Sequence, residues 1–489
     1  MTTALKGHAM GAGVTRRRVV LGSLLAGTLG RDRLPAVAAR RLARAESRPN
    51  IVFIITDDLD LHSLDAMPRI STLLADQGMT FSRAHVASPS CCPSRASILR
   101  GQYPHNHGVL GNRYPNGGYE MFSQRGHEES TVATWLQAAG YRTGLVGKYL
   151  NNYPLADDPT HVPPGWDAWY GYSGSGKYFS WMLNEQGHLV EYGNEPADYE
   201  TDVIARKAIA FIAEHAAGEA PFFLYIAPPA PHAPAIAAPR HEDAFLDATA
   251  PRTPAFNEDD VSDKPRWVQK SSPLTTAEIA EIDASYRARL RSLLAVDELV
   301  QRVVDTLEAS GALDNTYIFL TSDNGYDLGE HRLTLGKGAP YEPAIHVALL
   351  VRGPGVAAGQ IEARLVVNTD LAPTFAALAG AETPDFVDGR SLLPLLHGEE
   401  GSWRRAVLSQ FIDEFHVLVT ADRAYIAHRD RGHNRELYDL AADPYQLDNL
   451  IASPGWQTEA AVLDTWLAAL ATCAAAECHG LEDGPPAAS

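Results

Sequence analysis

Short apolar runs separated by longer amphipathic stretches dominate the hydrophobic pattern of this chain. The runs are rich in Val, Ile, Phe and Leu and end in polar or Gly/Pro clusters, which is typical of strands buried on both faces of a parallel sheet. We predict such strands at residues 51–56, 141–146, 222–226, 317–321 and 347–351. The helical periodicity between them predicts helices at 70–77, 130–139, 202–216, 277–310 and 369–379. This alternation predicts an α/β fold with a large, mostly parallel sheet flanked by helices.

The pattern changes near residue 400, where short alternating segments follow one another and precede a final helix. We predict strands at 406–411, 416–420 and 424–428 and a helix at 458–473. These segments indicate a smaller C-terminal subdomain with an antiparallel sheet. A stretch rich in Pro, Asp and Ala, residues 237–272, is predicted to be a long loop near the rim of the site. We therefore divide the chain into a leader (1–45), a catalytic domain (46–399) and a C-terminal subdomain (400–489).

The first 45 residues have the pattern of an export signal. Arg16, Arg17 and Arg18 stand directly before a short apolar, Gly-containing run, residues 19–27, which Ala-rich sequence follows. The paired arginines favour the twin-arginine route, with its translocase as a partner and a secreted, extracytoplasmic location. The alternative is a membrane anchor, but the run is well short of the roughly 18 residues that a membrane span needs.

Charge excludes one class of function. The chain carries 41 Lys and Arg against 60 Asp and Glu, a formal net charge of −19. Residues 1–45 hold nine basic and one acidic side chain, so the remainder carries −27. A body this acidic does not attract nucleic acid non-specifically. It should also repel long polyanions, which favours small anionic substrates or exposed chain ends.

Polar side chains follow several predicted strands at the point where each strand ends. They are Asp57 and Asp58, Lys148, His232, and Asp323 with Asn324. Ligands of open α/β sheets bind outside the carboxyl ends of the strands, so we expect these side chains to converge. Three carboxylates and an amide form an all-oxygen set, which favours calcium or magnesium over zinc. The alternative is that each pair only caps a turn, but two such pairs at strand ends favour a metal site.

The segment from Ser90 to Gly101 predicts a helix whose start binds an anion. Pro93 suits the first helical position and Gly101 the end, so Cys91 would lie just ahead of unpaired backbone N–H groups. Arg95, one turn in, would point its donors at the same place. The generic interpretations are a cysteine nucleophile or a redox pair, but neither explains the spacing Cys-x-Pro-Ser-Arg that begins at Cys91. Near the other terminus, Cys473 and Cys478 could close a small disulfide loop.

The run Cys91-Cys92-Pro93-Ser94-Arg95, followed by Leu99-Arg100-Gly101, resembles the signature of type I sulfatases. In that family the first cysteine is oxidised to formylglycine. The resemblance extends over the chain after the leader and includes Gly147-Lys148, Ser322-Asp323-Asn324-Gly325 and Gly336-Lys337. Within the family the chain is most similar to N-acetylglucosamine-6-sulfatases and their bacterial relatives.

The resemblance implies a sulfatase/alkaline-phosphatase-like fold and a secreted enzyme that cleaves sulfate monoesters, either aryl sulfates or 6-sulfated amino sugars. It implies that hydrated formylglycine at Cys91 attacks sulfur, and that a formylglycine-generating enzyme acts as a maturation partner. Calcium, with magnesium less favoured, would be held by Asp57, Asp58, Cys91, Asp323 and Asn324. Arg95 would hold the formylglycine hydroxyl, while Lys148, His232 and Lys337 would grip the sulfate oxygens. His232 or Lys337 would protonate the leaving oxygen.

One position departs from the family pattern. Many sulfatases carry a histidine two residues after the lysine that matches Lys148, where this chain has Leu150. Asn151 would bind sulfate but cannot act as a base. His331 is a candidate base, or else a loop histidine bonded to backbone. Two alternatives stay open: a phosphate or phosphonate monoester hydrolase of the same architecture, and an inactive binder of sulfated glycans if Cys91 is unmodified.

Overall fold

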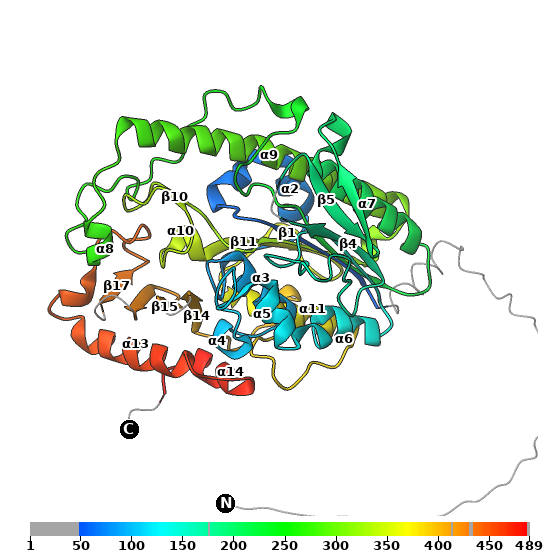
Figure 1. The fold of residues 1–489 in the computed structure, drawn as a ribbon. Coiled ribbons are helices and arrows are strands. Elements are labelled where there is room, and N and C mark those ends of the chain that lie inside the picture. The colour runs from blue at the N-terminus through cyan, green and yellow to red at the C-terminus, as the bar shows by residue number, and fades with distance from the viewer. Residues whose placement is uncertain (1–47, 175–176, 412–413, 430–433, 487–489) are drawn as a thin grey trace, which may run out of the picture. The chain divides into compact units, whose positions relative to one another are not determined.

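An 11-stranded mixed sheet forms the centre of the fold in the computed structural model (Figure 1). Its middle strands run parallel in the order β8-β1-β7-β3-β4. They are β1 (Asn50–Thr56), β3 (Arg142–Gly147), β4 (Ala168–Ser173), β7 (Phe222–Ala227) and β8 (Thr316–Ser322). Because parallel strands point the same way, their carboxyl ends meet at one edge of the sheet. The predicted α/β fold with a mostly parallel central sheet is confirmed.

The structure describes residues 48–174, 177–411, 414–429 and 434–486. The predicted twin-arginine leader, residues 1–45, lies outside these ranges. Within them, no helix combines the length and apolar character needed to cross a bilayer. The predicted domain boundaries at residues 45 and 399 stay a prediction.

Further strands extend the parallel centre on both sides, with both antiparallel and parallel pairings. On one side lie β11 (His346–Arg352), β2 (Met79–His85), β12 (Gln360–Glu362) and β13 (Val366–Val367), and on the other β5 (Trp181–Glu185) and β6 (His188–Tyr192). We predicted β11 within a mostly parallel sheet, but it runs antiparallel to β8. The chain between them holds only β9 (Asp327–Leu328), β10 (Leu335–Gly336) and α10 (Glu342–Ile345), with no long crossover helix to return it to the opposite edge.

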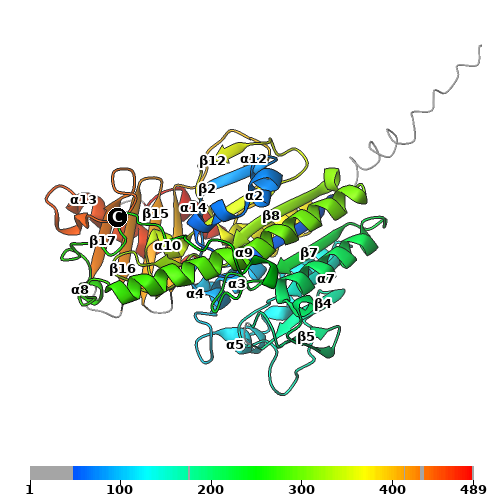
Figure 2. The same cartoon turned by 90° about the horizontal axis from the view of Figure 1, so that it is seen from above.

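Helices cover both faces of the sheet, as alternation along β1 requires. Val52 and Ile54 face a core formed with α2 (Pro68–Ile70), α7 (Glu200–His215) and α9 (Thr276–Ala309). Ile51, Phe53 and Ile55 face the opposite core, formed with α3 (Cys91–Arg100), α6 (Val132–Ala138) and α11 (Leu371–Ala379). Figure 2 shows α9 and α7 side by side across one face.

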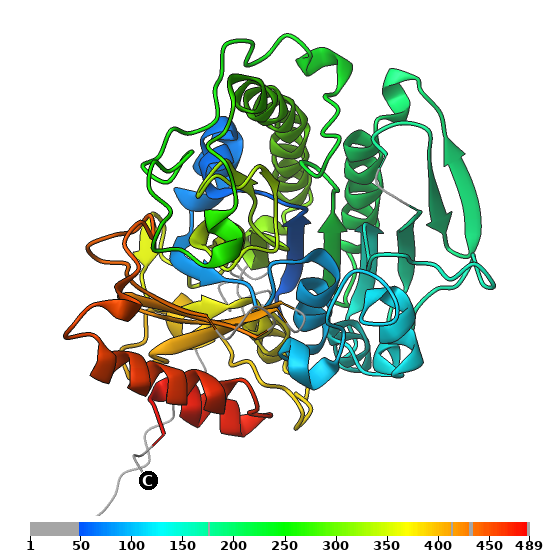
Figure 3. The ribbon, with the colours of Figure 1, turned by 60° about the vertical axis from the view of Figure 1, so that its left-hand side comes forward.

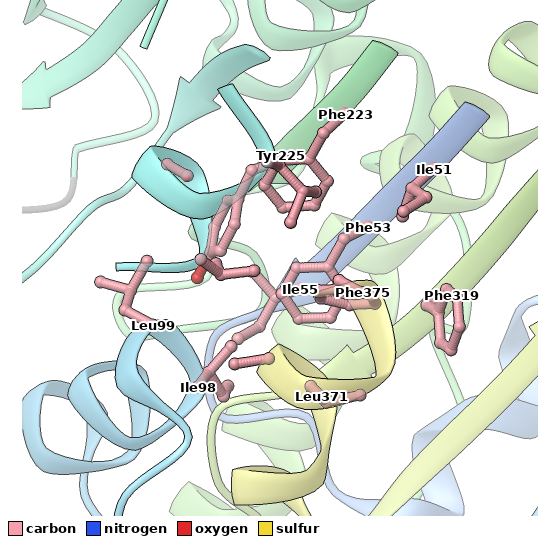
Figure 4. Close-up of a cluster of buried hydrophobic side chains, with 14 of the residues drawn as sticks. Ile51, Phe53, Ile55, Ile98, Leu99, Phe223, Tyr225, Phe319, Leu371 and Phe375 are labelled. Carbon is pink, nitrogen blue, oxygen red and sulfur yellow. The ribbon is translucent and has the colours of Figure 1, made fainter. Parts of the chain in front are cut away.

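The second core fixes α3 against the sheet (Figure 4). The ring of Phe375 on α11 lies 5.2 Å from that of Phe53 on β1 and 5.0 Å from that of Phe319 on β8. Ile98 and Leu99 of α3 belong to the same buried cluster. Burying a side chain of this size contributes about 1.5–3 kcal/mol, so α3 is held rigidly at the carboxyl edge of β1 and β8.

The smaller helices and the long loop complete the larger part of the chain. The remaining helices before residue 400 are α4 (Pro104–His107), α5 (Gly118–Gln124), α8 (Arg266–Gln269) and α12 (Leu393–Leu396). The predicted helix at 70–77 consists of α2 and a π-helical turn, Ser71–Ala75. Residues 237–272 contain only the short 3-10 turn Pro239–His241 and α8, which agrees with the predicted loop.

A separate four-stranded antiparallel sheet follows residue 400. It contains β14 (Ala406–Phe411), β15 (Phe415–Thr420), β16 (Arg423–His428) and β17 (Arg435–Asp439), of which the last was not predicted. The helices α13 (Gln457–Leu470) and α14 (Ala476–Asp483), red in Figure 3, pack beside this sheet. A disulfide joins Cys473, which follows α13, to Cys478 within α14, and confirms the predicted pairing.

Candidate functional site

Buried polar side chains gather at the carboxyl edge of the parallel strands. Asp57 and Asp58 directly follow β1, Asp323 follows β8, and Cys91 is the first residue of α3. One ligand atom from each of these four side chains lies within 4.8 Å of the others, and all four residues are at most 2% exposed. The sheet topology therefore brings together the carboxylates that the sequence placed at strand ends.

The start of α3 places Cys91 at the unpaired N–H groups of the helix. The preceding Ser90 is extended, with φ −151°, and Cys91 takes up the first helical position. We predicted Pro93 at the start of the helix, but the helix begins two residues earlier, since Ser90 already accepts a hydrogen bond from Ser94 N at 3.0 Å. Cys91 is thus part of the helical N-terminus, where the helix dipole favours a developing negative charge.

The backbone of Asp58 is held in an unfavourable conformation. Its φ is +67°, a region that residues with a β-carbon rarely adopt. Its N–H donates to Asp323 Oδ1 at 3.2 Å, and its carbonyl accepts a hydrogen bond from the guanidinium of Arg289, which also binds Asp60 Oδ2 at 3.0 Å. Strain of this kind persists where surrounding contacts over-determine the geometry, which is common at functional sites.

Two lysines and a histidine face these carboxylates. Lys148 Nζ donates to Asp57, while Lys337 Nζ donates to Asp58 and lies 2.6 Å from Cys91 Sγ. Cys91 Sγ is itself 3.2 Å from Asp57 Oδ1. His232 Nε2 lies 3.8 Å from Asp58 Oδ2. The predicted cationic residues therefore surround the predicted oxygen ligands.

A glycine permits the approach of Lys148. Gly147 ends β3 with φ +114°, and a β-carbon there would lie 2.2 Å from the carbonyl oxygen of Ala227 on the neighbouring strand. Lys148 N donates to that same carbonyl at 2.9 Å. Only glycine fits this close approach, which turns the chain so that Lys148 reaches Asp57.

The pKa values of the three carboxylates in the cluster are shifted in different directions. Burial raises the pKa of Asp57, but Lys148, His232 and Lys337 together lower this pKa well below its usual value. Burial also raises the pKa of Asp58, but Lys337 outweighs this effect, so the Asp58 pKa is lowered. Burial and the charge of Asp57 instead raise the pKa of Asp323. The neighbouring cations therefore outweigh burial at Asp57 and Asp58 but not at Asp323.

The thiol of Cys91 is poorly suited to direct nucleophilic attack. Burial, together with the carboxylates of Asp323 and Asp57, raises the pKa of the Cys91 thiol well above its usual value. A cysteine nucleophile needs the thiolate, which this surrounding disfavours. Burial also raises the pKa of the neighbouring Cys92, to about 12.

Arg95 ties the cluster together from within α3. Its Nε donates to Asp323 Oδ2 at 2.7 Å, and both side chains are fully buried. Its NH1 group donates to the backbone carbonyl of Lys148 at 3.0 Å. One guanidinium thus fixes the end of β8 relative to the end of β3.

The donor set fits a hard divalent cation. Asn324 Nδ2 donates to Asp58 Oδ1 and to the carbonyl of Gly325, both at 2.8 Å. Its amide oxygen, Oδ1, is buried and has no hydrogen-bond partner among the described residues. Such an orphaned oxygen beside three carboxylates is the arrangement that calcium or magnesium would satisfy.

Two predicted residues stand apart from this arrangement. His331 Nδ1 lies 2.6 Å from Glu258 Oε2, and no described hydrogen bond or ion pair joins His331 to the carboxylate cluster. The Asn151 amide oxygen is buried without a partner among the described residues, and the Asn151 backbone lies beside the Cys92 thiol. Leu150 is buried in the core.

Sequence reasoning missed two buried residues near the site. Arg289 lies on the buried face of α9 and donates a hydrogen bond to the Asp58 carbonyl. A charged residue at a core position of that helix could have identified Arg289 from the sequence. Glu200 starts α7 with both carboxyl oxygens buried and unpaired among the described residues. Burial raises the Glu200 pKa well above its usual value, and the charge of Asp57 adds to this rise.

Comparisons with known proteins agree with this geometry. Residues 49–381 match the model of the family described as Sulfatase, and residues 329–472 match N-sulphoglucosamine sulphohydrolase, C-terminal. The chain is 41% identical over 383 residues to N-acetylglucosamine-6-sulfatase of Homo sapiens, covering 76% of this chain and 69% of that protein.

Two solved structures share the fold. One, solved in complex with its substrate D-glucosamine-2-N,6-O-disulfate, has a TM-score of 0.71 and 26% identity, and the match covers 86% of this chain and 97% of that one. The other, a phosphonate monoester hydrolase from Silicibacter pomeroyi, has a TM-score of 0.66 and 22% identity over 85% of this chain and 94% of that one. At that identity the second likeness concerns the fold alone.

Proposed function

This chain belongs to the sulfatase family and is a sulfuric ester hydrolase, and from this premise we propose that its nucleophile derives from Cys91 beside a bound divalent cation. The observation that carries the proposal is the position of Cys91: first in a buried helix, 3.2 Å from Asp57 Oδ1 and 2.6 Å from Lys337 Nζ. Its thiol is a poor nucleophile as it stands. Conversion of Cys91 to formylglycine by a maturation enzyme would supply a better nucleophile at this position.

Asp57, Asp58, Asp323 and Asn324 would hold the cation, with the group at position 91 alongside. We propose calcium, with magnesium less favoured, because the donors are all oxygens. When both groups are in place, formylglycine hydrate supplies an attacking hydroxyl, and the cation lowers the pKa of that hydroxyl and polarises a sulfate oxygen.

Lys148 and Lys337 would grip the sulfate oxygens. Their ammonium groups now neutralise Asp57 and Asp58, and their side chains are 15% and 18% exposed. A cation between those carboxylates would take over the neutralising role and leave the ammonium groups for the sulfate. Donors held in a site with little water interact more strongly with developing charge than they would in solvent.

Arg95 and His232 would take different parts in the reaction. Arg95 is fully buried and donates to Asp323 and to the Lys148 carbonyl, so it would position the ligands, and it would also hold the hydroxyl at position 91. The His232 side chain is 36% exposed, which places it where a leaving alcohol reaches solvent. His232 Nδ1–H donates to the carbonyl oxygen of Ala233 at 2.8 Å, which fixes the ring, and Nε2 would hold a proton for the leaving oxygen only in the doubly protonated ring.

The substrate we propose is a small sulfate ester, either an aryl sulfate or a 6-sulfated amino sugar at a chain end. The 41% identical relative is an N-acetylglucosamine-6-sulfatase, and the 26% identical structure holds D-glucosamine-2-N,6-O-disulfate. Asn151, whose amide oxygen is buried without a hydrogen-bond partner among the described residues, would contact the sulfated group through its amide N–H. We propose export through the twin-arginine translocase, which carries folded and already modified protein. The three-part division of the chain belongs to this proposal.

The test compares turnover of nitrophenyl sulfate and nitrophenyl phosphate by calcium-loaded enzyme, with Cys91→Ala and Cys92→Ala as a matched pair. We expect preference for the sulfate, no turnover by Cys91→Ala, and near-native turnover by Cys92→Ala. Preference for the phosphate would favour the phosphate or phosphonate monoester hydrolase. Full activity of Cys91→Ala would refute a nucleophile at position 91. Absence of turnover by the native chain, with retained binding of sulfated glycans, would favour an inactive binder.

A further inference from the structure

A second cluster of potential ligands lies on the same edge of the large sheet, at the end of β2. Both β2 and β8 run antiparallel to β11, so they point the same way and their carboxyl ends share an edge. His85 is the last residue of β2, and His346 is the first of β11. The two are direct cross-strand partners, and their rings stack with centroids 4.9 Å apart.

Glu342 completes the cluster from the turn before β11. It begins α10 and stands four residues before His346, the spacing that puts two side chains on one face of a helical turn. Its Oε2 lies 3.0 Å from His346 Nδ1, and its Oε1 lies 3.3 Å from His85 Nε2. One ligand atom from each of the three residues lies within 4.8 Å of the others.

The orientation of His346 suits a metal ligand. Its Nε2 donates to the carbonyl oxygen of Ser82 at 3.0 Å, which leaves Nδ1, on the side of Glu342, as the ring nitrogen that would ligate an ion. A ligating histidine commonly donates its other N–H to a backbone carbonyl in this way.

Ion pairing alone accounts poorly for the cluster. His85 is 3% exposed and its Nδ1 has no hydrogen-bond partner among the described residues, so a charged ring there would bury an unsatisfied N–H group. A metal ion uses both rings in their neutral form and still compensates the carboxylate.

The three side chains also line a cavity of about 300 Å³. Asp60 and Tyr326 line it too, but Asp57, Asp58, Cys91 and Asp323 do not. The cluster is therefore separate from the oxygen site at β1 and β8. A metal ion held by the three side chains would keep a coordination position open to the cavity, as three-ligand zinc sites do.

We propose that His85, Glu342 and His346 bind one divalent transition-metal ion, Zn²⁺ in preference to calcium or magnesium. Two imidazoles and one carboxylate suit zinc, whereas hard cations prefer oxygen alone. Neighbouring ligand atoms in a tetrahedral zinc site stand about 3.3 Å apart, given Zn–N bonds of about 2.0–2.1 Å. In this structure the two oxygens of Glu342 bridge the ring nitrogens that would face the ion, with Oε2 3.0 Å from His346 Nδ1 and Oε1 3.3 Å from His85 Nε2.

The test is metal binding by the full chain, with no reference to sulfatase activity. Protein stripped with a chelator is first saturated with calcium, which occupies the oxygen site, and is then titrated with Zn²⁺ against a chromophoric chelator. We expect one equivalent of Zn²⁺ per chain, and Co²⁺ should give the intense visible bands of a tetrahedral nitrogen and oxygen site. In the conservative variant Glu342→Gln and in the double variant Glu342→Gln/His346→Ala, Zn²⁺ affinity should fall at least tenfold.

The matched control is Glu298→Gln, which alters another His–Glu pair. His241 Nε2 lies 3.1 Å from Glu298 Oε1, and no second histidine pairs with Glu298 among the described residues. We expect this variant to bind Zn²⁺ as the native chain does. Failure of the native chain to bind an equivalent of Zn²⁺ would overturn the proposal. So would unchanged Zn²⁺ affinity in folded Glu342→Gln protein. The cobalt spectrum of the native chain tests the site even if the double variant does not fold, because octahedral bands alone would contradict it.

Discussion

Replacing Arg95 by methionine should destabilise the protein and abolish catalysis, and the two effects can be measured separately. Arg95 Nε and Asp323 Oδ2 are 2.7 Å apart, and neither side chain is exposed. The substitution keeps most of the buried volume but removes the charge. It leaves the Asp323 carboxylate with a remaining hydrogen bond from Asp58 N at 3.2 Å, and the Lys148 carbonyl without its 3.0 Å donor.

The expected loss of unfolding free energy is about 3–5 kcal/mol, the usual result when one partner of a buried ion pair is removed. A divalent cation at the oxygen site would compensate part of the stranded charge on Asp323. The loss should therefore be larger in chelator than in saturating calcium. A fully exposed pair would instead lose at most about 1 kcal/mol, whether or not calcium is present.

The assay is urea unfolding with and without calcium, together with kcat/KM on nitrophenyl sulfate for protein that remains folded. Arg404→Met is a matched control, because Arg404 and Asp370 are equally buried and form two hydrogen bonds of 2.6 Å away from the cluster. It should lose a similar free energy, show no calcium dependence of that loss, and retain native kcat/KM. If both variants lose the same free energy regardless of calcium, the cation site is refuted. Native kcat/KM in Arg95→Met would refute the role of Arg95.

Three further predictions concern charge. Lys148→Met should lower kcat/KM for nitrophenyl sulfate about 10²–10³-fold. Lys207→Met, which breaks the ion pair with Glu185 away from the site, should leave kcat/KM unchanged. Equal effects of the two substitutions would contradict sulfate binding by Lys148. Glu200 has a raised pKa in the folded chain, so native stability should fall as pH rises above the unfolded-state Glu pKa of about 4.3. Above that pH, Glu200→Gln should have a higher melting temperature than the native chain, and in acid this advantage should disappear. A difference in melting temperature that does not change with pH would refute this. Short 6-sulfated saccharides should outcompete intact sulfated polymer at low salt, and cleavage at internal sites of long chains would contradict the charge argument.

The central strands and the oxygen ligands were predictable because both depend on local pattern. The continuous apolar runs of β1 and β8 are typical of strands buried on both faces of a parallel sheet. Parallel pairing of these two strands then puts Asp57 and Asp323 at the same edge, independently of the fold of the other segments. The antiparallel direction of β11 was not predictable from its own residues. It follows from the short connection after β8, which the apolar pattern of β11 does not encode.

Contacts between distant segments account for most of what the sequence could not predict. Lys337 lies outside any long predicted element and became a candidate only through the family resemblance, although it reaches Cys91. His85 and Glu342 are 257 positions apart, and only the pairing of β2 with β11 brings them together. No spacing along the chain predicts such a cluster. The same is true of Arg289, whose contact with Asp58 depends on how α9 packs on the sheet.

The most direct test of the proposed mechanism is mass spectrometry of the tryptic peptide that spans Cys91. Trypsin should cut after Arg83 and Arg95 and release residues 84–95, which contain both Cys91 and Cys92. After treatment with iodoacetamide, we predict one alkylated cysteine, at position 92, and an aldehyde or its hydrate at position 91. A peptide from active enzyme that carries two alkylated cysteines, with no aldehyde form, would contradict the account.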